Sequence, residues 1–415
     1  MAEVEGLGAR RAALNMLDAV LRRGQTLDSA AQGTKLPPQD AALAVAIAGE
    51  TLRRLPDLDA LIDSATRQPL PDDSKARMVL RLALAQKAGL GTPDHALVAT
   101  ALPLVAGGPR RLVHGVLGTL LRRGLSLPDA PTLPPEVQER WREAWGEEVM
   151  LAARGAIGHR PPLDLSFASD EQAQAYPLGT SLALRHRRIE DAGNVTELPG
   201  FGSGAWWVQD LAASIPARLM PAEPGNVVDL CAAPGGKTMQ LAAAGHRVTA
   251  LDRSKSRLAR LADNLARTGL GVELEVADAL EWEAPRKFDA ILLDAPCSAT
   301  GTFRRHPEVL YRARPPVIAD SAALQARLLD RAPAMLKPGG MLVYSVCSLE
   351  RQEGEETVAA FLERNPAFRL EPPQPSELPA GVTPSTEGWV RVLPGMLESA
   401  GGLDGFFAAR LVHKA

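Results

Sequence analysis

Residues 227–238 read VVDLCAAPGGKT, and they show what kind of domain fills the second half of the chain. The stretch passes from a short apolar run through a glycine-rich turn into a segment of helical character. Glycine lets the backbone approach a ligand closely, and the free N–H groups at a helix N-terminus attract an anion. Two anionic ligands fit such a turn. One is a nucleotide phosphate, and the other is the methionine carboxylate of S-adenosylmethionine.

The end of this stretch imitates a P-loop, but Cys231 stands where the pattern GxxxxGK[ST] requires its first glycine. Asp252 ends the next apolar run, sixteen residues after Gly236, where an acidic side chain accepts hydrogen bonds from ribose hydroxyls. Asp278 ends the third run, where it is placed to meet the adenine amino group. Either aspartate alone is as easily explained as a solvated strand end. Two aspartates at the ends of successive strands favour S-adenosylmethionine over a nucleotide phosphate as the ligand.

Two cysteine motifs close the following apolar runs: DAPC ends at Cys297, and YSVCS surrounds Cys347. Carbon C5 of cytosine becomes nucleophilic only after a thiolate adds to C6, and a second group must then remove the C5 proton. A single cysteine at a strand end is usually inert packing. All three cysteines of this chain, however, lie in ligand-side loops, the third being Cys231. The pair therefore points to cytosine-5 methylation.

Strand-length apolar runs alternate with helical segments from residue 226 onward, which predicts a mostly parallel sheet covered on both faces. We expect strands over residues 226–230, 247–251, 272–277, 288–294 and 341–346, and a last strand over residues 405–412 at one edge. We expect helices over residues 238–244, 255–267, 321–336 and 355–364. Ligands bind beyond the carboxyl ends of the strands in such sheets, where all of these motifs fall.

Residues 9–123 show apolar residues at helical spacing without strand-like alternation, which predicts an all-helical bundle. The predicted helices include residues 9–23, 77–87 and 112–121; Arg10, Arg11, Arg22 and Arg23 lie outside the apolar face of the first. The whole chain has a net charge of −3, but residues 1–125 hold sixteen Lys or Arg against twelve Asp or Glu. This mildly basic part permits RNA contact without requiring it.

We divide the chain into a helical domain (residues 1–130), a linker subdomain (131–205) and an α/β domain (206–415). No run of 18 apolar residues occurs, and the first eight residues lack the order of a signal peptide. Three cysteines cannot form a closed disulfide framework, and no metal-binding spacing occurs among the cysteines and seven histidines. We expect a cytoplasmic, reduced protein without a metal and without an obligate protein partner.

Residues 206–415 closely resemble the NOL1/NOP2/Sun family of RNA 5-methylcytosine methyltransferases. The family's DAPCSGTG is matched at residues 294–301, except that Ala299 replaces glycine. Its YSTCS element is matched at residues 344–348 with Val346 for threonine, and its C-terminal DGFF at residues 404–407. The resemblance implies a Rossmann-like methyltransferase domain that uses S-adenosylmethionine and releases S-adenosylhomocysteine.

The resemblance also implies roles for individual residues. Cys347 is implied to be the nucleophile and Cys297 the releasing residue, with Asp294 beside them; spacing alone does not assign the two cysteine roles. Contact with the cofactor is implied for Cys231, Ala232, Ala233, Pro234, Gly235, Gly236, Lys237, Asp252, Arg257, Asp278 and Asp294.

The helical N-terminus resembles the NusB-like RNA-binding domain. A NusB-like domain ahead of this catalytic domain is similar to bacterial family members that methylate a cytosine in 16S rRNA, so RNA, and 16S rRNA in particular, is the expected partner. Transfer RNA is the alternative substrate. From other classes, a P-loop nucleotidase and a non-catalytic RNA-binding protein with a vestigial methyltransferase fold are the rivals; the second predicts lost cysteines. Arg304, Arg305 and His306 either hold the RNA backbone or lie in a solvated loop.

Overall fold

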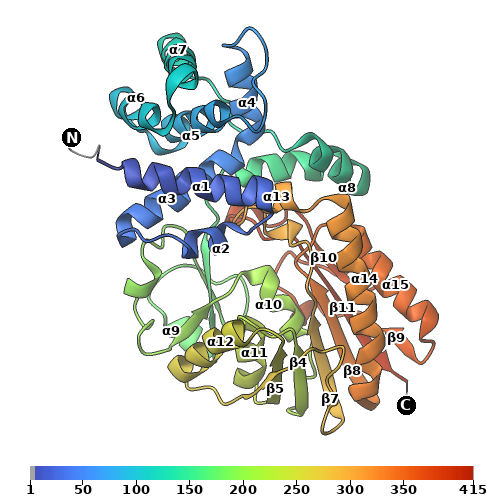
Figure 1. The fold of residues 1–415 in the computed structure, drawn as a ribbon. Helices are drawn as coiled ribbons and strands as arrows, with labels where there is room; N and C mark the ends of the chain where they lie inside the picture. Colours follow the sequence, from blue (N-terminus) through green and yellow to red (C-terminus); the bar gives the residue numbers. More distant parts are fainter. Residues whose placement is uncertain (1–4, 415) are drawn as a thin grey trace. The chain divides into compact units, whose positions relative to one another are not determined.

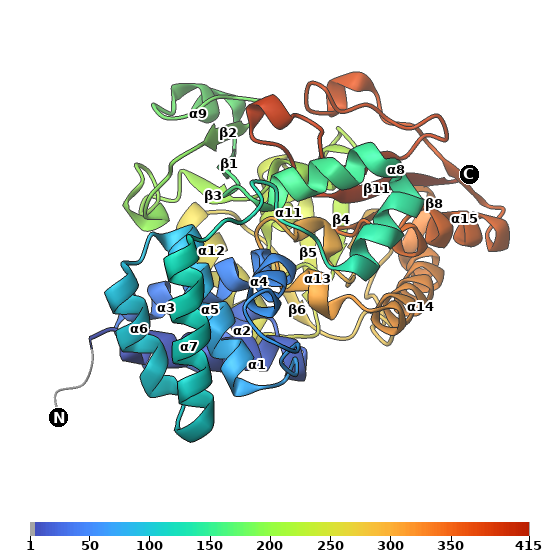
Figure 2. The same ribbon diagram turned by 90° about the horizontal axis from the view of Figure 1, so that it is seen from above.

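A computed structural model describes residues 5–414 and divides into two compact units (Figures 1 and 2). The helical unit comprises Met1–Arg160 together with a short later segment, Phe303–Arg312. The α/β unit comprises Pro161–Thr302 and Ala313–Ala415. The division into three domains, with boundaries at residues 130 and 205, remains a prediction.

The first part of the helical unit consists of helices alone, as the apolar spacing predicted. They are α1 (Leu7–Arg23), α2 (Leu27–Gln32), α3 (Pro38–Arg53), α4 (Leu55–Asp63), α5 (Lys75–Leu90), α6 (Asp94–Ala101), α7 (Gly107–Arg123) and α8 (Pro135–Ile157). Helix α5 is buried from Ala76 to Gln86. Its two buried arginines, Arg77 and Arg81, both form ion pairs with Asp59. The placement of Arg10 outside the apolar face was wrong. Arg10 is buried, and its Nε donates to Oε1 of Gln86 at 2.8 Å, which satisfies the guanidinium inside the bundle.

The segment Phe303–Arg312, directly after the DAPC motif in sequence, belongs to the helical unit and contains the short helix α13 (Val309–Arg312). The Phe303 ring lies 5.3 Å from that of Trp141, and the Tyr311 hydroxyl donates to the carbonyl of Leu52 at 2.8 Å. Arg304 is buried, and Arg305 and His306 are half-buried, so they do not form a fully solvated loop. The sequence carried no signal of this because the contacts join residues far apart in the chain. Contact of these three residues with RNA remains a prediction.

The α/β unit begins with a small antiparallel sheet in the order β2-β1-β3. Its strands and the helix beside them are β1 (Leu163–Phe167), α9 (Asp170–Ala175), β2 (His186–Ile189) and β3 (Trp206–Val208). Asp164 of β1 is 1% exposed and binds Nε and Nη2 of Arg188 at 2.7 Å each. The same carboxylate accepts the backbone N–H of Leu211 at 2.9 Å, so this ion pair joins the small sheet to the start of helix α10.

The large sheet has the order β10-β11-β8-β7-β4-β5-β6, with β9 paired to β11. Its strands are β4 (Asn226–Leu230), β5 (Arg247–Asp252), β6 (Glu273–Val276), β7 (Phe288–Asp294), β8 (Leu336–Val346), β9 (Phe368–Leu370), β10 (Val390–Val392) and β11 (Phe406–His413). Strands β4 to β8 pair in parallel, and β11 runs antiparallel to β8. The predicted strand over residues 405–412 exists but is not at the edge, because β10 and β9 pair with it on its other side.

Helices cover both faces of the large sheet, as its apolar runs predicted (Figure 1). They are α10 (Leu211–Arg218), α11 (Gly236–Ala243), α12 (Lys255–Thr268), α14 (Pro315–Arg331) and α15 (Glu355–Arg364). Val228 of β4 packs in one apolar cluster with Leu328 of α14, while its neighbour Val227 packs with Ile215 on the opposite face. None of the helices built from the described residues is long and apolar enough to cross a membrane.

The Asp164 ion pair generates the first prediction. Burial alone would raise the pKa of the Asp164 carboxyl, but its bonds with Arg188 and His186 outweigh burial and hold the pKa well below its ordinary value. Asp164→Asn leaves the buried Arg188 guanidinium without its counter-charge, so the free energy of unfolding should fall by about 3–5 kcal/mol in urea titrations.

Because the folded-state pKa of Asp164 is lowered, its stabilisation is fully present above the unfolded value of about 3.9. It is lost as the pH falls through the folded-state pKa. The control is Asp330→Asn, which breaks an exposed ion pair with Arg364 and should change stability by less than about 0.5 kcal/mol. Equal effects of the two variants would contradict this assignment.

Candidate active site

The glycine-rich turn connects strand β4 to helix α11 at the carboxyl edge of the large sheet. Cys231 begins the turn with φ 63°, a left-handed conformation that is uncommon outside glycine and tends to occur at functional sites. Gly235 has φ 107°, and a Cβ there would lie 2.1 Å from Cδ1 of Leu261, so only glycine fits. Helix α11 starts at Gly236, so its first N–H groups, which have no partner within a helix, lie in this turn.

Asp252, at the end of β5, holds the turn in place. Its Oδ2 accepts the backbone N–H of Ala233 at 3.2 Å, and its Oδ1 accepts that of Ser254 at 2.8 Å. Nη1 of Arg257 lies 3.6 Å from Oδ2, and Arg257 also donates to the carbonyl of Ala233. The structure thus brings together three of the residues predicted to contact a cofactor.

Asp278 lies just beyond β6, as predicted, but closes a local turn there. Its Oδ1 accepts the backbone N–H of Leu280 at 2.9 Å, and its carbonyl accepts that of Trp282 at 2.8 Å. Within residues 5–414 it forms no hydrogen bond or ion pair with another predicted site residue. Its expected contact with adenine therefore rests only on its position two residues after Val276, which pairs with Asp252.

Lys237 of the turn binds Asp294, which ends β7. Its Nζ lies 2.7 Å from Oδ2 of Asp294, whose Oδ1 accepts the Ser345 hydroxyl at 2.9 Å. Burial alone would lower the pKa of Lys237, but the charges of Asp294 and Cys347 raise it above its ordinary value. The Lys237 ammonium also lies 5.1 Å from the centre of the Phe406 ring. A fixed positive charge therefore stands between the turn and the two cysteine motifs.

Asp229, three residues before the turn's first alanine, was not singled out from the sequence. It is fully buried, and burial, with a smaller effect of Asp294, raises its pKa to about 7. Its Oδ2 accepts the Thr238 hydroxyl at 2.6 Å, while its Oδ1 has no hydrogen-bond partner within the described chain. An acidic residue inside an otherwise apolar strand run is the sequence signal that could have found it.

The two predicted catalytic cysteines are in contact, with 3.5 Å between their sulfur atoms. Cys297 follows β7 and Cys347 follows β8, the neighbouring parallel strand. The bond to Cys347, burial, and the charges of Cys347 and Glu353 raise the pKa of Cys297 well above its ordinary value. A sulfur pair at this separation can act on two adjacent atoms of one substrate ring.

Glu353 was missed by the sequence reasoning, although it lies next to both cysteine motifs. Its fully buried carboxyl accepts the backbone N–H of Ser298 at 2.8 Å and the Ser348 hydroxyl at 2.5 Å. Arg391 also contacts the second motif, because it donates to the carbonyl of Ser348 at 2.5 Å. The same guanidinium donates two hydrogen bonds to the Glu355 carboxylate. The acidic residues that follow Cys347 in sequence were the available signal.

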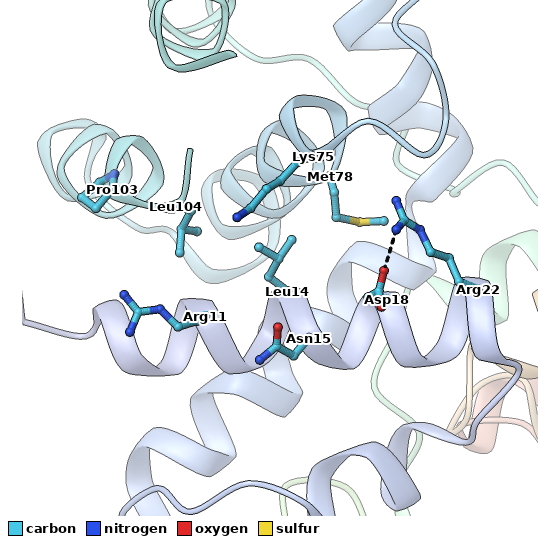
Figure 3. Close-up of a pocket in the computed structure, with 9 residues that line it drawn as sticks. All are labelled: Arg11, Leu14, Asn15, Asp18, Arg22, Lys75, Met78, Pro103 and Leu104. Atoms are coloured by element: carbon cyan, nitrogen blue, oxygen red, sulfur yellow. Dashed lines mark ion pairs between the residues drawn. The ribbon is translucent and has the colours of Figure 1, made fainter. Parts of the chain in front are cut away.

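The helical unit holds a pocket of about 490 Å³ beside α1 and α5 (Figure 3). Leu14, Met78 and Leu104 give it an apolar wall, and Arg11 and Lys75 are exposed at its rim. None of its lining residues is a predicted catalytic residue. Within the described residues, no group of three or more His, Cys, Asp or Glu side chains is placed to hold a metal ion.

Comparison with known proteins agrees with both units. The sequence matches the NusB family over residues 7–122 and the family "16S rRNA methyltransferase RsmB/F" over residues 216–412. It is 32% identical to the ribosomal RNA small subunit methyltransferase B of Klebsiella pneumoniae subsp. pneumoniae, over 99% of each protein. It is 35% identical to the protein of that name from Thermus thermophilus, over 93% of this chain and 92% of the relative.

The fold agrees as well. The crystal structure of PH0851 superposes with a TM-score of 0.74 at 24% identity and covers 99% of both chains. The predicted fold class, a NusB-like helical domain followed by a Rossmann-like methyltransferase domain, is confirmed. By identity over nearly its whole length, the chain belongs to the ribosomal RNA small subunit methyltransferase B family of RNA methyltransferases.

Proposed function

We propose that this protein transfers a methyl group from S-adenosylmethionine to carbon C5 of a cytosine in 16S rRNA. The observation that carries the proposal is the 3.5 Å contact between the sulfurs of Cys297 and Cys347 at the ends of neighbouring parallel strands. Methylation at C5 needs two groups that act on adjacent ring atoms, and this pair supplies them. A vestigial RNA-binding protein has no reason to keep the two thiols in contact.

The reaction divides between the two thiols. The Cys347 thiolate adds to C6, and the π electron pair of the C5–C6 bond then forms a bond from C5 to the methyl carbon. The bond from that carbon to the sulfonium sulfur breaks, which leaves S-adenosylhomocysteine. Cys297 accepts the C5 proton, the C5–C6 double bond re-forms, and the C6–sulfur bond breaks to return Cys347. The target cytosine must be unpaired or turned out of its helix, because stacked neighbours shield the C6 face.

The residues at the glycine-rich turn fit S-adenosylmethionine, which supplies an electrophilic methyl group when bound. The N–H groups at the start of α11 suit its carboxylate. The two oxygens of Asp252 accept two backbone bonds, so half of the four acceptor positions of a carboxylate are left for ribose hydroxyls. A P-loop nucleotidase fits less well, because the Lys237 ammonium that would meet a phosphate is already bound to Asp294.

The charges around the thiols support Cys347 as the nucleophile. The Lys237 ammonium interacts electrostatically with Cys347. Cys297 donates to or accepts from Cys347, is buried and interacts with Glu353, and together these raise its pKa well above the ordinary value. Cys297 is therefore disfavoured as the thiolate that attacks first.

The cysteine roles can be read from the two alanine variants. Cys347→Ala should abolish methylation and leave no covalent bond to RNA, because the atom that adds to C6 is gone. Cys297→Ala should still form the bond but fail to break it, since the C5 proton stays in place. A protein–RNA complex that survives denaturing electrophoresis should accumulate only in the second variant.

Cys231→Ala is the matched control, because Cys231 lies in the same region but outside the sulfur pair. It should leave no trapped complex, even where a changed cofactor turn slows methylation. Trapping by Cys347→Ala instead of Cys297→Ala would reverse the assigned roles. Full activity in both variants would end the thiolate mechanism.

The cofactor proposal predicts that S-adenosylmethionine and S-adenosylhomocysteine bind and that ATP does not. Asp252→Asn keeps the shape of the side chain but loses the charge that strengthens its bonds to hydroxyls. Binding should weaken by about 1.5–3 kcal/mol in calorimetry. Asp330→Asn, exposed on α14, should not change it. Comparable affinity for ATP, or an unchanged Asp252→Asn, would count against the site.

RNA contact is proposed for the helical unit. Residues 95–128 contain no Asp or Glu, and helix α7 carries the exposed Arg110, Arg111 and Arg122. Within residues 5–414, none of these three pairs with a carboxylate, whereas Arg142 of α8 binds Glu139 and Glu147. Arginines without a protein counter-charge suit phosphates.

The pocket in Figure 3, with its apolar wall and exposed Arg11 and Lys75, suits an unpaired nucleotide.

The double variant Arg110→Ser/Arg111→Ser should raise KM for RNA while kcat and S-adenosylmethionine affinity stay unchanged. Each lost phosphate contact should also reduce the salt dependence of RNA binding, by a slope of about 1 per arginine. Arg142→Ser is the control, because its charge is already balanced by two glutamates. An equal rise in KM for the control and the double variant would remove α7 from the RNA interface.

A further inference from the structure

Glu353 is the last residue of a short 3₁₀ turn (Arg351–Glu353) that follows the second cysteine motif. Its side chain is fully buried. Oε1 accepts the backbone N–H of Ser298 at 2.8 Å and Nε2 of Gln325 at 3.1 Å. Oε2 accepts the hydroxyls of Ser348, at 2.5 Å, and of Ser298. Four donors on one carboxyl are enough to hold it in a single orientation.

The two serines bound by Glu353 are the immediate neighbours of the catalytic cysteines. Ser298 follows Cys297 and Ser348 follows Cys347, so one carboxyl group joins the loops that carry both sulfurs. The backbone of Glu353 is itself fixed to β8, because its carbonyl accepts the Tyr344 hydroxyl at 2.5 Å. Glu353 thus holds together the two loops whose sulfurs lie 3.5 Å apart, although it forms no hydrogen bond with either sulfur.

We propose that Glu353 is a positioning residue for methyl transfer, which aligns the two cysteine loops and makes the two thiols electrostatically unequal. This inference rests on the proposed function. Gln325 of α14 and the Ser298 backbone neutralise part of the cost of burying the carboxyl. Arg391 forms two hydrogen bonds with the Glu355 carboxylate, while the Glu353 charge acts on Cys297.

The charged and titratable groups around the sulfur pair make this inequality explicit. Cys297 interacts with Cys347, with Glu353 and with Tyr344, whose pKa burial raises well above its ordinary value. Lys237 interacts electrostatically with Cys347. Once the Cys347 sulfur is bonded to C6, its negative charge no longer opposes ionisation of Cys297. Cys297 can then release its own proton to solvent water and, as a thiolate, accept the proton from C5.

The test uses the full-length protein with the isosteric variant Glu353→Gln. Affinity for S-adenosylmethionine and KM for a 16S rRNA fragment should change by less than about twofold. The single-turnover rate of release of methylated RNA, which requires Cys297, should fall by about 10- to 100-fold at neutral pH, since small misplacements of catalytic groups have effects of that size. The rise of the rate with pH should move to lower pH, because Glu353 raises the pKa of Cys297 and the glutamine does not.

Two controls separate positioning from general support of the fold. Glu355→Gln removes another buried carboxylate, at the first residue of α15, and should lower the melting temperature without moving the pH profile. Glu353→Asp keeps the negative charge but has a shorter side chain. Its rate should therefore fall while its pH profile stays unchanged. This variant replaces Glu353→Gln if Glu353→Gln does not fold.

An unaltered rate in Glu353→Gln, or a loss of rate in both Gln variants with no shift of the profile, would overturn the proposal. Failure of the proposed function itself is distinguishable. In that case the unaltered protein would not methylate RNA, and Cys347→Ala would behave like it.

Discussion

The parallel register between β7 and β8 is the constraint on which the active site depends. Asp294 pairs with Ser345 across these strands, so Cys297 and Cys347 leave the sheet at the same edge. The register continues into the loops, where Ala295 donates to the carbonyl of Ser345 at 2.9 Å. A slip of one residue would turn the side chains of β8 to the other face and separate the sulfurs. Glu353 holds the two cysteine loops together through its bonds to Ser298 and Ser348.

The parts of the molecule that depend on local pattern were predictable. Strand β4 and helix α15 have the predicted bounds, because each is a mostly apolar or amphipathic run between clear breaks. The turn at Gly235 and the aspartate at the end of β5 were predictable too, since the chemistry of the ligand dictates those residue types. The cysteine pair could be proposed because all the cysteines of the chain lie in ligand-side loops.

The parts of the molecule that depend on contacts between distant segments of the chain could not be predicted from the sequence. Glu353 acts through Ser298, 55 residues earlier in the chain, and nothing in the spacing reveals that bond. The segment Phe303–Arg312 belongs to the helical unit although its sequence lies inside the α/β unit. Arg10 looked like a surface residue until Gln86, 76 residues away, was found to accept from it. Both Glu353 and Arg10 are polar residues that can be buried because a partner far away in the sequence forms a hydrogen bond with them.

Bisulfite sequencing of 16S rRNA from cells with the gene, without it, and with only the Cys347→Ala form tests the central claim most directly. The reagent converts cytosine but leaves 5-methylcytosine unchanged. One 16S cytosine should resist conversion in the first cells and be converted in the other two. Identical conversion of every 16S cytosine in all three would contradict methylation of this RNA by the Cys347 thiolate.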